Sequence, residues 1–406
     1  MIKIKLWTLL LILLLTVLIG SASAELNETE QLGKKIFFDK ISNPDSMACA
    51  KCHAPQVGFT GPIPGINLKG SVYRGAMPQR FGNRKPPSAA YATLSPVFHY
   101  DEEEDLFIGG NFWDGRATGE ILGNPAADQA MGPFLNPVEH NNPSKLAVLE
   151  QIASSKYVGL WEAVWGPMSL DTQEEIDESY GNVGLSIAAY EDSSEVNQFS
   201  SKYDANLKGE AELTEEEAWG LELFNGKAMC SNCHPSEPGP YSDHPLFTDF
   251  TFDNLGIPRN PDNPVYDTEG RDWVDPGLGG FLETREEWND TFNVTENMGK
   301  HKVPTLRNVA LKPGNGFTKA YGHNGYFKSL EGIVHFYNTR DVLAGECDPF
   351  TTEKNALKMG CWPEPEVPIN VNEDELGNLR LNVTEEKAIV AFLKTLSDGY
   401  YVPEVP

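Results

Sequence analysis

The sequence Cys49-Ala50-Lys51-Cys52-His53 has a counterpart, Cys230-Ser231-Asn232-Cys233-His234, in the second half of this 406-residue chain. In a Cys-x-x-Cys-His sequence the two thiols form thioether bonds to a haem, and the adjoining imidazole binds its iron. Zinc also binds Cys-x-x-Cys pairs, but the adjoining histidines and the long separation of the two motifs do not favour it. The sequence therefore predicts two covalently bound haem c groups, with His53 and His234 as iron ligands.

The sequences around the two motifs follow one plan used twice. Asn27 with Glu30 and Thr214 with Glu217 are capping-box pairs, each of which begins a helix ahead of a motif. Strand signals are few, and long stretches rich in proline, glycine and asparagine are typical of ordered loops. We predict a mainly α fold of two cytochrome c-like haem domains related by duplication, with long ordered loops and little strand. The predicted domains are residues 25–205 and 206–406, and a helix over about residues 385–397 ends the second.

The first 24 residues are typical of a secretory signal peptide. Lys3 and Lys5 precede an apolar run, and Ala22-Ser23-Ala24 offers a small-residue cleavage site. An uncleaved membrane anchor is the alternative, although the apolar run is short for a membrane span. We expect an exported protein, periplasmic or otherwise extracytoplasmic, that does not contact the membrane once the signal is removed.

The two cysteines outside the motifs and the net charge add further expectations. In an oxidising compartment Cys347 and Cys361 form a disulfide, which stabilises the fold by about 3 kcal/mol in the chain-entropy model; two free thiols are the alternative. The formal net charge is −27. An acidic surface argues against nucleic acid as a partner, because the phosphate backbone repels it. The charge either attracts a basic redox partner or simply keeps the protein soluble.

Several further motifs make the sequence resemble one family in particular, which the haem motif alone would not do. The chain resembles the bacterial di-haem cytochrome c peroxidase family, and within it the branch that includes MauG, over essentially its whole mature length. The motifs that carry this resemblance, besides the two haem motifs, are Gly33-Lys34-Lys35-Ile36-Phe37, Phe112-Trp113-Asp114-Gly115-Arg116-Ala117, Gln129-Ala130-Met131-Gly132-Pro133, Asn136-Pro137-Val138-Glu139 and Pro304-Thr305-Leu306-Arg307-Asn308-Val309-Ala310-Leu311.

The resemblance implies roles for three further residues. Glu139 matches the distal acid–base residue at a peroxide-binding first haem, Gln129 matches its neighbour, and Trp113 matches a residue that relays electrons between the haems. Cleavage of a bound peroxide needs a proton moved from its inner to its outer oxygen, and a carboxylate over the iron can do this.

The resemblance also implies a different sixth ligand at each iron. Tyr337 matches the ligand of the second haem, where the peroxidases have methionine and MauG has tyrosine; His335 or Met359 is the alternative. The segment from Gly58 to Phe98, where many peroxidases carry a histidine that blocks the first iron, contains no histidine. We therefore expect the first iron to have an open sixth position. His99 and His140 are the nearest histidines in the sequence that could block it instead.

One position departs from the family pattern. The family holds a calcium ion between the haems, partly through an asparagine just before a Pro-Ser or Pro-Thr pair, and here Lys85 occupies that position. An ammonium group cannot ligate calcium. Either Asn83 serves instead or the lysine charge replaces the ion, and the second is our hypothesis.

Three functions are compatible with these features. The first is an oxidoreductase that reduces hydrogen peroxide at the open haem, with electrons from a c-type cytochrome or a cupredoxin that arrive through the second haem. The second is MauG-like oxidation of tryptophan or tyrosine residues in a partner protein. The third is a non-catalytic di-haem electron-transfer cytochrome, which would need neither Glu139 nor an open iron. The family resemblance also allows a homodimer.

Overall fold

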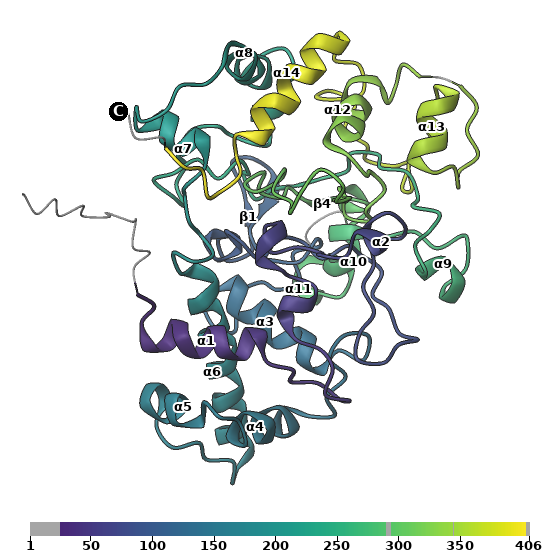
Figure 1. The fold of residues 1–406 in the computed structure, drawn as a ribbon. Coiled ribbons are helices and arrows are strands. Elements are labelled where there is room, and N and C mark those ends of the chain that lie inside the picture. The colour runs from purple at the N-terminus through teal and green to yellow at the C-terminus, as the bar shows by residue number, and fades with distance from the viewer. Residues whose placement is uncertain (1–24, 290–293, 344, 403–406) are drawn as a thin grey trace, which may run out of the picture.

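The computed structural model describes residues 25–289, 294–343 and 345–402, so the predicted signal peptide lies outside the described residues. The described chain is mainly helical, with long connecting loops (Figure 1). The helices of the first half are α1 (Glu28–Phe38), α2 (Pro64–Asn67), α3 (Pro125–Leu135), α4 (Lys145–Ala153), α5 (Val158–Trp165), α6 (Gln173–Asp192) and α7 (Lys202–Leu207). Those of the second half are α8 (Glu215–Asn225), α9 (Val265–Thr268), α10 (Gly277–Glu283), α11 (Glu286–Asn289), α12 (Leu330–Thr339), α13 (Glu353–Met359) and α14 (Val383–Lys394).

Strands contribute little to the described part of the chain. β1 (His99–Asp101) pairs with β2 (Leu106–Ile108), and β3 (Phe252–Asp253) pairs with β4 (His301–Lys302), both antiparallel. The register places Tyr100 opposite Phe107 in the first pair and Asp253 opposite His301 in the second. The predicted fold class, mainly α with long loops and little strand, is confirmed.

The same helix crossing occurs in each half. Helix α1 packs on α6, and α8 packs on α14. The two crossings need a glycine because the helices touch backbone to backbone: a Cβ atom on Gly33 would lie 1.8 Å from the Ser186 carbonyl oxygen, and one on Gly220 would lie 2.0 Å from that of Ala388. Both predicted capping boxes are present at the starts of α1 and α8.

Two hydrophobic cores lie behind these crossings. One gathers residues of α1, α3, α4 and α6 around Trp161, and the other gathers residues of α8 and α14 around Phe392. The boundary predicted at residue 205 falls inside α7, and Tyr203 of that helix packs in the second core. Figure 1 shows α1, α3, α4, α5 and α6 in the lower part of the view and α7, α8, α12, α13 and α14 in the upper part. The division into two domains stays a prediction.

The C-terminal region differs from the sequence prediction in its helix bounds. Helix α14 begins at Val383 rather than near residue 385, because the Asn382 side chain accepts hydrogen bonds from the backbone N–H groups of Thr384 and Glu385. It ends at Lys394, ahead of the predicted stop. Cys347 and Cys361 form a disulfide, with Cα atoms 5.9 Å apart.

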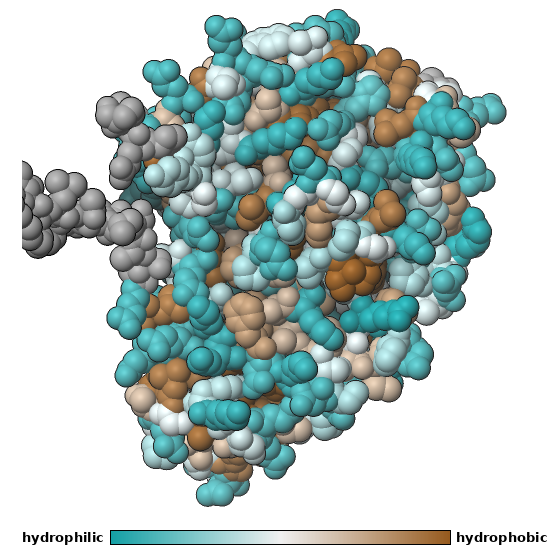
Figure 2. All heavy atoms as spheres, in the orientation of Figure 1, coloured by the Kyte–Doolittle hydropathy of each residue, from teal (hydrophilic) through white to brown (hydrophobic). Residues whose placement is uncertain are grey.

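The surface of the described chain is predominantly polar on the face that Figure 2 shows, where hydrophobic residues appear as separate spots between hydrophilic ones. Within the described ranges, no helix combines the length and the apolar character that a membrane span requires.

Candidate haem sites

The two Cys-x-x-Cys-His motifs adopt the same local conformation. Each forms a short 3-10 turn, η1 (Cys49–Lys51) and η4 (Cys230–Asn232). In each, the backbone N–H of the histidine donates to the carbonyl of the first cysteine, at 2.9 Å for His53 and for His234. None of the four cysteines is in a disulfide, and each lines a cavity together with its histidine.

Both histidines are oriented as metal ligands usually are. The Nδ1 atom of His53 lies 3.1 Å from the carbonyl oxygen of Phe59, and that of His234 lies 2.8 Å from the carbonyl oxygen of Phe247. A hydrogen bond from Nδ1–H to a carbonyl fixes the tautomer that leaves Nε2 free to bind a metal. Burial also lowers the pKa of each imidazole to about 4, which keeps it in the neutral form that a ligand requires.

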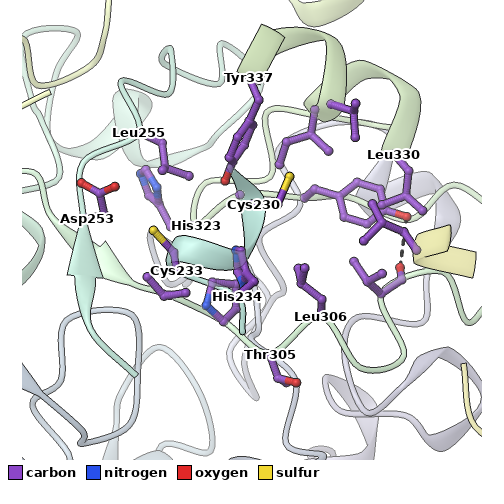
Figure 3. Close-up of a pocket in the computed structure, with 18 of the residues that line it drawn as sticks. Cys230, Cys233, His234, Asp253, Leu255, Thr305, Leu306, His323, Leu330 and Tyr337 are labelled. Atoms are coloured by element: carbon purple, nitrogen blue, oxygen red, sulfur yellow. Dashed lines mark hydrogen bonds between the residues drawn. The ribbon is translucent and has the colours of Figure 1, made fainter. Parts of the chain in front are cut away.

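The second cavity has a volume of about 1660 Å³, counted to its open mouth, and is lined by His234, both cysteines of its motif and Tyr337. Figure 3 shows the phenol ring of Tyr337 extending from α12 into the cavity, on the opposite side from His234. Burial raises the pKa of Tyr337 well above its usual value, with Arg340 as an opposing cation. The pocket alone therefore favours the neutral phenol, and an iron opposite the ring would supply the charge that a phenolate needs.

The two alternative ligands of the second iron lie elsewhere. Nδ1 of His335 is 3.0 Å from a carboxylate oxygen of Glu386, and neither His335 nor Met359 lines the cavity. Met359 is at the end of α13 with 58% of its surface exposed. Of the three residues considered from the sequence, Tyr337 is the one whose side chain reaches the second cavity.

The first cavity has a volume of about 1640 Å³ and brings together His53, Gln129 and Glu139. Gln129 lies on α3. Glu139 lies in the turn that follows this helix, where its backbone N–H donates to the Asn136 carbonyl at 3.0 Å. Burial raises the pKa of Glu139, while Arg116 acts against the shift. A carboxyl of raised pKa that faces an open cavity is suited to accept and return a proton.

Among the described residues that line the first cavity, the imidazoles are those of His53 and His140. Nδ1 of His140 is 2.7 Å from the Ile41 carbonyl oxygen, and the buried ring packs edge-on against Phe134. His99 lies on the exposed strand β1, away from this cavity. Thus His99 is not placed to block the first iron, whereas His140 shares the cavity with Glu139.

Trp113 lies between the two cavities and lines both of them. Its indole Nε1–H donates to the Lys85 carbonyl at 2.8 Å, and its own carbonyl accepts from the Lys302 N–H at 2.8 Å. These two bonds fix an aromatic ring in the wall that the cavities share. The other residues that line both cavities are Lys85, Pro87, Ser88, Lys302, Val303, Pro304 and Thr305.

Comparison with known proteins identifies the family. MauG of Paracoccus denitrificans is 34% identical over 379 residues, an alignment that covers 92% of this chain and 89% of MauG. The chain belongs to the di-haem cytochrome c peroxidase family. The family model described as di-haem cytochrome c peroxidase matches residues 27–212. A cytochrome-c peroxidase of Denitromonas iodatirespirans, IdrP2, is 26% identical over 90% of this chain and 81% of its own length. The diheme peroxidase BthA of Burkholderia thailandensis superposes with a TM-score of 0.74 at 29% identity, over 94% of this chain and 89% of BthA.

Membership in the di-haem cytochrome c peroxidase family makes this chain an oxidoreductase of the peroxidase or MauG type and implies two c-type haems. The residues fit such groups: each motif presents two free thiols and one neutral imidazole whose Nδ1 lies at a backbone carbonyl. Cys49, Cys52 and His53 would hold the first haem, and Cys230, Cys233 and His234 the second.

The residues between the cavities do not fit a calcium ion. Calcium takes six to eight oxygen ligands, often carboxylates. Among the described residues that line both cavities there is no carboxylate, but there are two lysines. The Lys85 ammonium donates to the Thr60 hydroxyl and the Pro86 carbonyl, each at 3.1 Å. Asn83 lines the first cavity only.

A second buried ammonium lies near Lys85. Lys319 donates to the carbonyls of Val57 at 2.8 Å, Asn308 at 2.6 Å and Leu311 at 3.1 Å. Burial, together with the charge of Lys85, lowers its pKa well below the usual value. Carbonyls from both halves are thus engaged by a side chain of the protein.

Sequence reasoning missed two cavity residues. Lys302 of β4 lines both cavities and donates to the Ser95 hydroxyl at 2.7 Å. Glu191 of α6 is a buried carboxyl that lines the first cavity. The sequence signal that could have identified Glu191 is its place as an acidic residue on the apolar face of α6. This signal is recognised only when α6 is aligned with α14, which has leucine at the corresponding position.

Proposed function

We propose that this protein is an exported di-haem peroxidase that reduces hydrogen peroxide at the first site with electrons delivered through the second. The observation that carries the proposal is the asymmetry of the two cavities. The first contains Glu139 and Gln129 and no histidine from residues 58–98, whereas the second contains Tyr337 opposite its histidine. A haem bound at the first site would supply the iron that binds peroxide and the electrons that reduce it.

Glu139 acts on the proton of the substrate in this proposal. Its carboxylate accepts the proton from the inner oxygen of peroxide and returns it to the outer oxygen, so that the outer oxygen leaves as water. Gln129 on α3 lines the same cavity and can orient the substrate through its amide. The carboxylate must be ionised to begin this cycle, and its raised pKa makes the ionised group a stronger base for the proton it takes.

Trp113 provides the electron path between the sites. Its ring is held by the indole hydrogen bond to the Lys85 carbonyl, and its backbone by the bond from Lys302, in the wall that the cavities share. Two electrons are needed for each peroxide reduced to water, and both enter from a donor outside the protein. A c-type cytochrome or a cupredoxin with a basic docking surface suits the net charge of −27. The location we propose, the periplasm or another extracytoplasmic compartment, rests on the predicted signal peptide.

Peroxide turnover tests the proposal. We expect purified protein with both haems to change its absorption spectrum within seconds of mixing with hydrogen peroxide. In steady state it should oxidise many equivalents of a reduced c-type cytochrome or cupredoxin per protein. Stopped-flow spectroscopy and donor oxidation assays measure the two results, with samples lacking peroxide as the control. A protein that is inert to peroxide would overturn the proposal and leave an electron-transfer cytochrome.

MauG-like oxidation of a partner protein is the second candidate. Tyr337 favours it, because an anionic ligand stabilises higher oxidation states. MauG of Paracoccus denitrificans is also more similar to this chain than the peroxidase IdrP2 is. The same experiment separates the two, because a long-lived oxidised state with slow donor oxidation supports oxidation of a protein substrate.

We also propose that the lysine charge replaces calcium between the haems. Purified protein is then expected to contain well below one calcium per chain, and a chelator should leave both haem potentials unchanged. The physical reason is that Lys85, whose pKa of about 8 leaves it charged at neutral pH, supplies positive charge, and that Lys85 and Lys319 occupy the nearby oxygens. Elemental analysis together with redox titration in the presence and absence of chelator checks this, and one tightly bound calcium per chain would contradict it.

A further inference from the structure

Glu191 lies at a position whose counterpart in the second half is apolar. The repeated crossing sets the correspondence, because a Cβ on Gly33 would lie 3.0 Å from the Cβ of Tyr190, and one on Gly220 would lie 2.9 Å from that of Phe392. Tyr190 therefore corresponds to Phe392, and the next residues, Glu191 and Leu393, correspond in turn.

The aromatic contacts around the crossings support the same alignment. The ring of Phe37 meets that of Tyr190 edge-on at 5.4 Å, and Phe224 meets Phe392 edge-on at 5.2 Å. One turn earlier on each helix, Ile187 and Ile389 line the first and second cavities respectively. Helices α6 and α14 thus present corresponding faces to the first and second cavities. At the position of Leu393 the fold is satisfied by an apolar residue.

The first half places a carboxyl at this position instead. Glu191 is 4% exposed and Leu393 is 6% exposed, and each lines its own cavity. Among the described residues, the Glu191 carboxyl has no hydrogen-bond or ion-pair partner, and burial is the single cause that raises its pKa. Burial of an unpaired carboxyl costs free energy that leucine would avoid, so the residue is not explained by stability.

The surroundings of Glu191 contain few charges. On the helices packed against α6, Lys34 of α1 binds Glu195, and Lys145 of α4 binds Asp177. Asp128 of α3 accepts backbone N–H groups of its own loop. The 3-10 turn η3, residues 92–94, also packs on α6 and carries no charged residue. These charged groups are therefore engaged with partners other than Glu191. Of the remaining ones, Glu28 and Lys35 of α1 and Glu150 of α4 are exposed, and Glu30 caps α1.

Within the cavity, the charge of Glu191 acts on the thiol of Cys49. Burial and the charge of Glu191 raise the pKa of that thiol. A thioether bond to the haem would remove the thiol as a titrating group and would bring the edge of the haem beside the carboxyl. Glu139, His140, Lys85 and Lys302 also line this cavity with shifted pKa values.

We infer that Glu191 is a proton-carrying residue of the first haem site, which takes up a proton when the haem is reduced and releases it when the haem is oxidised. The inference rests on the proposed assignment of the first cavity to a haem. Burial raises the pKa of Glu191 to about 8, so the group is protonated at neutral pH and able to lose its proton. Oxidation adds one positive charge nearby, which favours the carboxylate.

The sign of the pH effect follows from this coupling. The pKa of Glu191 is lower beside the oxidised haem than beside the reduced haem, so the potential of the first haem falls as pH rises between the two values. A tenfold difference in proton affinity between the redox states corresponds to a fall of about 59 mV for one electron. The second haem, beside Leu393, lacks this contribution.

Redox titrations of both haems from about pH 6 to 10 test the inference. We expect the Glu191→Gln and Glu191→Leu variants to lose the fall in first-haem potential centred near pH 8. Glutamine keeps the size and polarity of the side chain, and leucine is the residue that the second half uses. The reciprocal Leu393→Glu variant should add a pH dependence to the second haem beyond any that Lys85 and Lys302, which line both cavities, already give it. Haem content, measured as two haems per chain, establishes that each variant is intact.

The comparison of variants decides the matter. A wild-type slope that persists in Glu191→Gln would overturn the inference and assign the proton to another group in the cavity. If Leu393→Glu does not retain two haems, the Gln and Leu variants at position 191 still decide. Absence of peroxide reactivity would refute the proposed function but leave this pH dependence in place, whereas absence of the pH dependence would refute only the role of Glu191.

Discussion

The Glu139→Gln variant is expected to react with hydrogen peroxide between about 100 and 10,000 times more slowly than the wild type, the range that a positioned acid–base group contributes. Glutamine preserves the shape of the side chain but cannot take a proton from the inner oxygen of peroxide and return it to the outer one. The haem motifs lie on other segments, so both haems should attach as before. Stopped-flow measurement of the second-order rate constant with peroxide gives the effect directly.

The pH profile adds a second measurement of the same role. Burial raises the pKa of Glu139 above that of an exposed glutamate, and the proposed cycle begins with the carboxylate. The wild-type rate should therefore fall on the acid side at a higher pH than an ordinary carboxyl would give, and the variant should lose this limb. Glu162→Gln, at an exposed position of α5, is the matched control for loss of one charge. A Glu139→Gln protein with unchanged turnover would rule out the proton-transfer role.

The features of the site that could be predicted from the sequence are those encoded locally. The Cys-x-x-Cys-His motif determines its own geometry within one turn, so five consecutive residues are enough to assign 49–53 and 230–234 to haem attachment. Capping boxes are also local, which is why the starts of α1 and α8 were predicted correctly. The start of α14 lies two residues before the predicted one, because Asn382 with Glu385 forms the capping box of this helix.

The features that could not be predicted depend on contacts between distant segments. Glu191 is one acid among many in the sequence until the crossing of α1 and α6 turns it toward the first cavity. Lys319 likewise looks like a surface lysine in the sequence, yet its ammonium binds carbonyls from both halves. His301 and His323 stack at 3.6 Å beside the second cavity although 22 positions separate them. In each case the surroundings of the side chain are set by the packing of distant segments, which no local pattern encodes.

The Tyr337→Met variant is expected to raise the reduction potential of the second haem by at least about 0.1 V, a modest part of the span of about 0.8 V that axial ligands cover. A phenolate is an anion and stabilises the oxidised iron, whereas a thioether is neutral and favours the reduced form. Burial strengthens the difference between the two ligands. A desolvated phenolate is costly without a nearby positive charge, so it interacts more strongly with the oxidised iron. Spectroelectrochemical titration of the second haem measures the shift, and its absorption spectrum should change at the same time.

A second tyrosine of the same cavity separates ligation from general effects of substitution. Tyr321 lines the cavity, but its hydroxyl donates to the Val309 carbonyl at 3.2 Å. Tyr321→Phe removes that hydroxyl without touching the proposed ligand, so the potential should stay close to the wild-type value. If Tyr337→Met changes neither spectrum nor potential, another residue binds the iron, and His335→Ala and Met359→Leu then identify which. An anionic ligand stabilises oxidised states of the haem. Tyr337→Met should therefore also shorten the lifetime of any oxidised state formed with peroxide. The identity of this ligand thus bears on the choice between peroxide reduction and oxidation of a partner protein.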